Sequence, residues 1–488
     1  MCGISGVALS SNTLRQHIEN LKHSRHPLIN ALHSSIRQIQ HRGYDGAGIA
    51  FLDGSLKKIS LIKQRGMVDE VFNSSESAPI LNNRELVTWS GIAHTRYKTV
   101  GPCSTSASQP LLSPDNKLCL AHNGQIEAKD LHPDSTYFID YFYNRLSRLA
   151  IHNQTVDRLI DAIYQLVDQL MNHVEGSYSC LLLVEGLGLV AFRDPHGIRP
   201  LIIGRSDDDD YMIASESVCL QPRDGICSKT FHLQRDVNPG ECLVLIKDRP
   251  PLSKQIRKCT PEHPFTPCVF EYIYLASSRS KLDGLEVKEA REHLGHLLAD
   301  HIHNKYPHLT IDLVTPVPES SCYATISMAS RLKELGHGCK YEHLLTLNTK
   351  RKKERSFILP TQEEREHAVA EKFVLPPGYD LQSRSLLVVD DSIVRGTTLK
   401  HILNTIRSTC INTGPIYVAS VAPPIINRNI FGIDIPDTDL LIGHNRTSDE
   451  IAKLLGADIV IYQDLEEMLD MFKNISPYAD RFEHSMFI

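Results

Sequence analysis

The sequence lacks several features that would assign it to a common functional class. No apolar run approaches the 18 or more residues that a membrane-spanning helix needs. No G-x-x-x-x-G-K is present, which excludes a Walker A phosphate loop. Internal repeats and low-complexity tracts are also missing. We therefore expect a globular protein with no membrane partner.

Charge of one sign and paired cysteines are scarce as well. The net charge is −6 and no basic block dominates, which argues against nucleic acid as the main partner. The 12 cysteines show no C-x-x-C spacing and are typical of reduced thiols rather than a disulfide framework. Residues 1–5 have no basic region before an apolar core, so we expect no signal peptide and a cytoplasmic location.

Length and proline distribution predict the domain organisation. A chain of 488 residues should hold two or three domains. Prolines crowd the stretch 248–267, and proline at this density favours neither a helix nor a central strand. We predict a first domain over 2–247, a linker over 248–267, a second domain over 268–475 and a C-terminal tail over 476–488.

The most informative stretch is 386–398, L-L-V-V-D-D-S-I-V-R-G-T-T. Its apolar residues predict a buried parallel strand, and a helical run follows over 399–407. The Gly-Thr-Thr turn at a helix start offers N–H groups and hydroxyls that suit a phosphate. Asp390 and Asp391 suit a sugar diol or Mg²⁺. The stretch indicates a phosphorylated ribose with a magnesium diphosphate; the alternative is an ordinary strand–helix turn with capping polar residues.

This stretch resembles the phosphoribosyl pyrophosphate (PRPP) motif of type I phosphoribosyltransferases. The resemblance implies that Asp390 and Asp391 hold the ribose hydroxyls and the metal. It assigns the 5-phosphate to the turn residues Ser392, Arg395, Gly396, Thr397 and Thr398. Ser321, in P-V-P-E-S-S after a predicted strand over 311–316, is a candidate for the diphosphate or the metal.

A basic stretch, K-R-K-K-E-R-S-F over 350–357, precedes this motif. Its position suggests a flexible lid over a polyanion, whereas most such runs are solvated loops. Phosphoribosyltransferases of this type carry a loop here that closes over PRPP, and Arg355 matches its arginine. Lys352, Lys353 and Glu354 stand where the aromatic, aliphatic and glycine residues usually are. This departure leaves the closure of the loop open.

The N-terminal half suggests a cysteine nucleophile. Removal of Met1 would leave Cys2 with a free α-amino group that can act as its base. Three glycine-bearing loops follow, over 41–48, 94–101 and 121–124. In these loops Arg96 could pair with a carboxylate, and Asn123 with the N–H of Gly124 could stabilise an oxyanion. Singly, each residue also fits a structural loop role.

In this order the loops resemble the class II glutamine amidotransferases. The resemblance implies Cys2 as nucleophile, Arg42 and Arg96 in glutamine recognition, and Asn123 and Gly124 as the oxyanion hole. It assigns the glutamine α-amino group to Asp134. The alternating short strands and turns over 176–246 suit the double sheet of that fold.

Both halves together resemble the glutamine PRPP amidotransferase family. The resemblance implies an α+β domain with the four-layer αββα N-terminal-nucleophile hydrolase fold, followed by an α/β parallel-sheet type I phosphoribosyltransferase domain. It implies that glutamine and PRPP give 5-phosphoribosylamine, glutamate and diphosphate, the first step of purine synthesis. It also implies Mg²⁺, a homo-oligomer and purine nucleotides as feedback ligands.

Some members of the family carry a [4Fe–4S] cluster, and here the cysteines depart from that pattern. Cys268 matches one cluster cysteine, but Asn429 stands at a second and no cysteine follows Cys410. Such a cluster needs four thiolates, so we expect none.

Three other readings stay open. The chain could be a divergent paralogue in a specialised pathway, or a PRPP- or nucleotide-binding regulator with weak transferase activity. Tyr44, in place of the usual glutamine, is the form seen in glucosamine-phosphate synthases. That third reading would need sugar-isomerase domains in place of the 386–398 motif.

Overall fold

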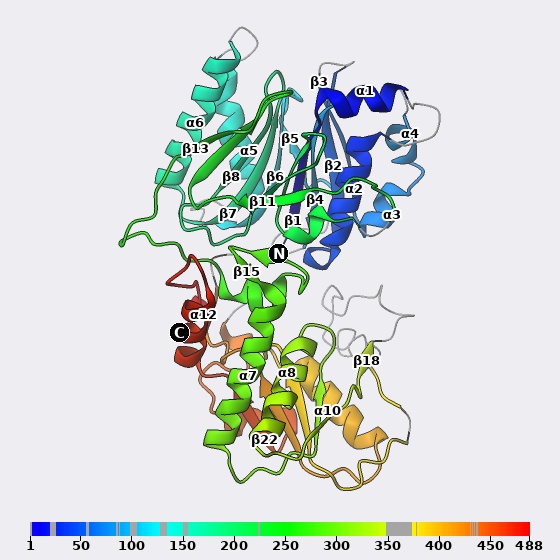
Figure 1. Ribbon diagram of the computed structural model, residues 1–488, viewed down its shortest axis with the longest axis vertical. Coiled ribbons are helices and arrows are strands. Elements are labelled where there is room, and N and C mark those ends of the chain that lie inside the picture. The colour runs from blue at the N-terminus through cyan, green and yellow to red at the C-terminus, as the bar shows by residue number, and fades with distance from the viewer. Residues whose placement is uncertain are drawn as a thin grey trace.

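The chain forms two bodies, one from each half of the sequence (Figure 1). No helix among the described residues is long and apolar enough to cross a membrane. The computed structural model describes residues 2–19, 26–54, 58–83, 86, 88–97, 105–126, 134–149, 155–222, 225–347, 373–376, 378–429, 431, 433, 435 and 438–488.

The first domain contains two antiparallel sheets. The seven-stranded sheet has the order β11 (His232–Asp236), β9 (Ile202–Arg205), β10 (Tyr211–Ala214), β1 (Gly3–Ala8), β4 (Ser90–Arg96), β2 (Gly46–Asp53) and β3 (Lys58–Gln64). The six-stranded sheet has the order β13 (Leu252–Gln255), β12 (Glu241–Leu245), β8 (Gly188–Arg193), β7 (Gly176–Val184), β6 (Leu118–Ile126) and β5 (Leu111–Leu112).

Helices cover the outer faces of both sheets. The first sheet packs against α1 (Ser11–Glu19), α2 (Pro27–Gln38), α3 (Val68–Phe72) and α4 (Ala78–Leu81); the second packs against α5 (Asp134–Leu146) and α6 (Val156–His173). A third core of small and aliphatic side chains, including Ile4, Ile92, Ala121 and Leu181, fills the space between the sheets. The predicted four-layer αββα fold is confirmed.

The predicted linker is wrong in part. Residues Leu252–Gln255 form the edge strand β13, which pairs antiparallel with β12 of the first domain. Pro250 and Pro251 come just before this strand, and an edge position leaves its outer backbone groups in solvent, where neighbouring prolines are tolerated. The first domain therefore extends beyond residue 247.

The second domain is built on a parallel sheet. Its order is β17 (Lys340–Tyr341), β16 (Leu313–Pro316), β20 (Leu386–Asp390), β21 (Ile416–Ser420) and β22 (Ile459–Tyr462). Two small antiparallel pairs join β14 (Lys281–Leu282) with β15 (Leu285–Glu286), and β18 (Thr346–Leu347) with β19 (Phe373–Val374).

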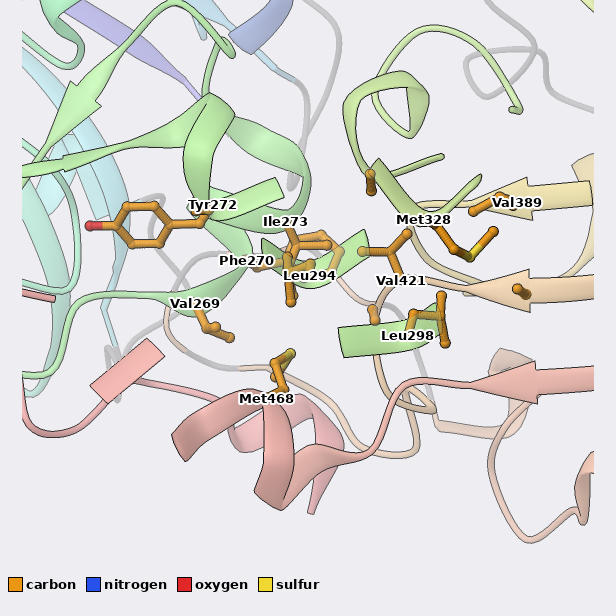
Figure 2. Close-up of a cluster of buried hydrophobic side chains, with 14 of the residues drawn as sticks. Val269, Phe270, Tyr272, Ile273, Leu294, Leu298, Met328, Val389, Val421 and Met468 are labelled. Carbon is orange, nitrogen blue, oxygen red and sulfur yellow. The ribbon is translucent and has the colours of Figure 1, made fainter. Parts of the chain in front are cut away.

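Successive residues of β20 pack on opposite faces of this sheet, as strand geometry requires. Leu387 and Val389 face a cluster with α7 (Val287–Lys305), α8 (Cys322–Glu334) and α12 (Leu465–Ile475), part of which Figure 2 shows. Leu386 and Val388 face a second cluster with α10 (Thr397–Thr409) and α11 (Ser448–Leu455). The predicted parallel-sheet domain and its buried strand are confirmed.

The expected C-terminal tail packs into this domain instead of leaving it. Glu483 forms a bridge with Cys268, and Met486 is wholly buried. Asn429 is buried and donates to Glu483 (3.0 Å) and Ser485 (3.1 Å). Cys268 is buried, and burial raises the pKa of its thiol to about 12. These contacts of Cys268 and Asn429 with Glu483 and Ser485 hold the chain end against the domain, and we call them the C-terminal lock.

Replacement of Asn429 by alanine should loosen this lock. The Asn429 oxygen also accepts from the N–H groups of Phe431 and Ile433, so the change leaves buried polar groups unpaired. We expect a loss of about 1–3 kcal/mol in unfolding free energy and faster proteolytic release of the C-terminal residues. Arg428→Ala, at an exposed neighbour, is the control. Equal behaviour of the two variants in thermal melting and proteolysis would contradict the lock.

Candidate active site

Cys2 lies at the start of the central strand of the first sheet. In β1, Gly3 stands opposite Thr95 of β4. The Cys2 Sγ atom is 3.9 Å from the carbonyl oxygen of Tyr97. A Cβ at Gly3 would lie only 2.7 Å from the Ile39 side chain, so the strand is closely packed where it leaves Cys2. The expected nucleophile is therefore next to the H-T-R-Y motif.

The loop over 41–46 packs on the same motif. A Cβ at Gly43 would be 2.4 Å from the Arg96 carbonyl carbon, a distance that only glycine allows. The Asp45 N–H donates to the Arg96 carbonyl (2.8 Å), and Gly46 pairs with Arg96 between β2 and β4. The Arg96 side chain is buried at this junction. Two of the three loops predicted from the sequence thus meet beside Cys2.

Asn123 and Gly124, the third predicted motif, lie on β6 of the facing sheet. Asn123 is wholly buried, and neither atom of its side-chain amide has a hydrogen-bond partner among the described residues. An unpaired buried polar group costs about 1–3 kcal/mol, so its persistence points to a ligand. Gly124 has a φ of 142°, and a Cβ there would be 2.0 Å from the Ser177 carbonyl oxygen. Both groups suit an oxyanion hole.

Asp134 is the first residue of α5 and is tied to the same strand. Its Oδ2 atom accepts from the N–H of Ile126, the last residue of β6 (3.2 Å). Burial raises the pKa of this carboxyl to about 6. A carboxylate that is partly removed from water pairs strongly with a cation, and its charge is sensitive to mild acid.

The structure corrects the prediction that Arg42 binds glutamine. Its guanidinium is completely buried and forms ion pairs with Glu216 and Glu271. Both pairs are direct hydrogen bonds, so the charge of Arg42 is already satisfied inside the protein. Arg42 lies in the loop next to Cys2, but its side chain faces the second domain and not a substrate.

Glu216 and Glu271, the partners of Arg42, were not predicted from the sequence. Glu216 also accepts from the N–H of Ser277 (2.8 Å) and the hydroxyl of Ser280 (2.6 Å), both in the second domain. Although burial opposes ionisation, Arg42 holds the pKa of Glu216 well below its usual value. In the sequence Glu216 stands between two serines and Glu271 between two aromatic residues, and neither context indicates a buried ion pair.

In the second domain, Asp390 ends β20 and Asp391 follows it, at the point where the strand order reverses. The chain first places β17 on one side of β16 and then β20 on the other. Ligands of open parallel sheets bind at this switch point, beyond the carboxyl ends of the strands. Both aspartates are mostly buried, and the Asp391 N–H donates to the Asp390 carboxylate (3.0 Å).

The structure does not support the expected role of Ser321 as a ligand of the metal or the diphosphate. The Ser321 hydroxyl is buried and donates to the carbonyls of Val317 (2.7 Å) and Val389 (2.9 Å). Because it points into the sheet, Ser321 is not placed as a metal or diphosphate ligand. Ser320 instead donates to the Asp391 carboxylate, which also accepts from Ser392 (2.7 Å). The two oxygen-rich side chains of Asp390 and Asp391 fit a Mg²⁺ ion.

The predicted phosphate turn opens to solvent at the start of α10. Gly396 is the N-cap with a φ of 75°, and a Cβ there would be 2.6 Å from Ile442. Thr397 and Thr398 are half-buried and Arg395 is exposed, so hydroxyls and N–H groups remain accessible. Arg355 and the basic stretch 350–357 lie outside the described residues.

Comparisons with known proteins agree with this geometry. A glutamine amidotransferase domain family matches residues 94–222. The amidophosphoribosyltransferase of Escherichia coli is 33% identical over 100% of this chain and 92% of its own length, and that of Saccharomyces cerevisiae is 33% identical over 100% and 91%.

Two solved structures share the whole fold. The first, described as the allosteric regulatory enzyme of purine biosynthesis, has a TM-score of 0.72 and 27% identity and covers 98% of this chain and 93% of its own. The second is the glutamine PRPP amidotransferase of B. subtilis in complex with ADP and GMP, with a TM-score of 0.68 and 27% identity over 100% and 99% of the two chains.

Removal of the Arg42 charge should test its structural role. In Arg42→Met, Glu216 and Glu271 lose a buried cation, and breaking such a pair costs about 3–5 kcal/mol. Arg37→Met removes an exposed pair with Asp69 and should cost about 1 kcal/mol or less. Thermal melting compares the two variants. A melting temperature for Arg42→Met equal to that of Arg37→Met would contradict the buried role.

Proposed function

The chain belongs to the amidophosphoribosyltransferase family, and we propose that the residues described above divide the reaction between two half-sites. The protein converts glutamine and PRPP into 5-phosphoribosylamine, glutamate and diphosphate, the first step of purine synthesis. One observation carries the division: Cys2 directly precedes the central strand of one domain, and the Asp390–Asp391 pair lies at the switch point of the other.

In the first half-site, Cys2 attacks the side-chain amide of glutamine. Its free α-amino group takes the thiol proton and passes it to the departing ammonia. Asn123 and the N–H of Gly124 stabilise the tetrahedral oxyanion, for which the unpaired buried amide is the support. Arg96 pairs with the α-carboxylate of glutamine and Asp134 with its α-ammonium. Water then hydrolyses the thioester and releases glutamate.

In the second half-site, PRPP lies over the carboxyl end of β20. The turn residues Ser392, Arg395, Gly396, Thr397 and Thr398 bind the 5-phosphate, and Asp390 and Asp391 bind the ribose hydroxyls. Ser320 holds the Asp391 carboxylate in place from the neighbouring loop. Ammonia attacks C1 of the ribose while diphosphate leaves. We also assign Arg355 to PRPP binding, because it matches the arginine of the phosphoribosyltransferase loop.

The acidic pair is the place for a divalent cation. Asp390 and Asp391 would hold Mg²⁺, which when bound supplies positive charge to the leaving diphosphate. The side chains keep this site in the protein interior, where Asp391 is 6% exposed and each of its oxygens accepts a hydroxyl.

Regulation and assembly follow the family. The B. subtilis structure holds ADP and GMP, and we infer that purine nucleotides regulate this protein as well. A homo-oligomer and a cytoplasmic location complete the proposal. The location rests on the absence of C-x-x-C spacing among the cysteines of the sequence.

The decisive measurement is coupled product release. Purified protein with PRPP, Mg²⁺ and glutamine should release glutamate and diphosphate in equal amounts. Cys2→Ser should abolish both, because the nucleophile is lost, yet release diphosphate when ammonia is added. Asp391→Asn is the reciprocal control and should reduce diphosphate release with either nitrogen source. Glutamate release without diphosphate would refute the transferase assignment.

Glutamine binding should weaken in mild acid. The Asp134 carboxyl has a pKa of about 6, so it is charged above this pH and neutral below it. Loss of its charge removes the partner of the glutamine ammonium. The affinity of the inactive Cys2→Ser protein for glutamine should fall by up to about tenfold per pH unit below pKa. The double variant Cys2→Ser, Asp134→Asn should bind glutamine weakly, with an affinity that does not change with pH. If the affinity of the double variant fell with pH as steeply as that of Cys2→Ser, the titrating group would not be Asp134.

A further inference from the structure

The helices α7 and α12 pack along one face of the parallel sheet. Leu294 and Leu298 of α7 join Met468 of α12 in the cluster of Figure 2. The side chain of Gln463, just before α12, donates to the Leu294 carbonyl (3.0 Å). This packing brings the next turn of α7 against the first turn of α12.

His301 lies on that turn of α7. Its side chain is only 10% exposed. Its Nδ1 atom is buried and has no hydrogen-bond partner among the residues that the structure describes. The Oε2 atom of Glu467 is 3.7 Å from this nitrogen, which is beyond hydrogen-bond distance. Buried polar atoms usually have a hydrogen-bond partner, so this nitrogen indicates a ligand site.

Two carboxylates face this nitrogen from α12. Asp464 is the N-cap, and its Oδ1 atom accepts from the N–H of Glu467 (3.1 Å), which orients its carboxylate. Glu467 is 47% exposed and can move. One ligand atom from each of His301, Asp464 and Glu467 lies within 4.8 Å of the others.

We propose that His301, Asp464 and Glu467 form a binding site for a divalent transition-metal ion, of which Zn²⁺ is the best match. The site is separate from the Asp390–Asp391 pair. One imidazole nitrogen and two carboxylate oxygens are ordinary zinc ligands at about 2.0–2.2 Å. Mg²⁺ and Ca²⁺ prefer oxygen ligands alone, so the histidine selects against them.

The ion would link α7 to the start of α12. His301 and Asp464 are held by packing and by the helix cap, so binding requires movement mainly of the exposed Glu467 side chain. Water would complete the coordination. No residue of the two half-sites takes part, so the ion would stabilise the second domain without entering the reaction.

The test is metal binding by the full-length protein in the absence of PRPP and Mg²⁺. Calorimetric titration with Zn²⁺ should show one equivalent whose affinity falls at least roughly tenfold in His301→Ala and in Glu467→Gln. The matched controls His296→Ala and Glu466→Gln change exposed residues of the same helices and should bind as the wild type does. Glu467 is exposed, so Glu467→Gln tests the site even if His301→Ala fails to fold.

Two further readouts separate this site from other ligands. Co²⁺ at a nitrogen–oxygen site gives weak visible bands without thiolate charge-transfer absorption, which excludes binding at the exposed Cys259. Zn²⁺ should raise the melting temperature of the wild type and of Asp391→Asn, but not that of Glu467→Gln. Zinc affinity that is unchanged in Glu467→Gln, or no binding by the wild type, would overturn the site.

Discussion

A buried set of charges at the domain junction is the constraint on which the rest of the molecule depends. Arg42 lies between Glu216 and Glu271, and Arg199 adds a second cation to Glu271 at 3.0 Å. These groups are nearly inaccessible to water, so each needs its partners in place. Because Glu216 also accepts from Ser277 and Ser280, only one docking of the two domains satisfies all of them.

This junction connects the second domain to the proposed glutamine half-site. Arg42 belongs to the loop whose Gly43 packs on the Arg96 backbone beside Cys2. Glu271 lies at the beginning of the second domain, in the apolar segment that packs against α7. A shift of one domain would therefore disturb the proposed glutamine half-site.

Regular elements were well predicted from the sequence because their patterns are local. The buried strand that begins at Leu386 and the helix Thr397–Thr409 that follows it need only a run of apolar residues or a 3.6-residue period. Prediction failed where the outcome depends on distant contacts. The strand β13 forms among prolines because β12 offers it a partner, and the chain end is buried because Asn429 binds it.

The sequence by itself determined the chemical inventory: an N-terminal thiol, an amide and a glycine for an oxyanion, and an acidic pair before a phosphate turn. Tertiary structure alone decided which groups are free to act. It buries Arg42 in ion pairs and directs the Ser321 hydroxyl to the Val389 carbonyl, while Ser320 contacts Asp391. It also leaves the Asn123 amide without a hydrogen-bond partner among the described residues. The reason is physical, because a polar side chain acts through its partners, and those partners come from strands and helices far away in the chain.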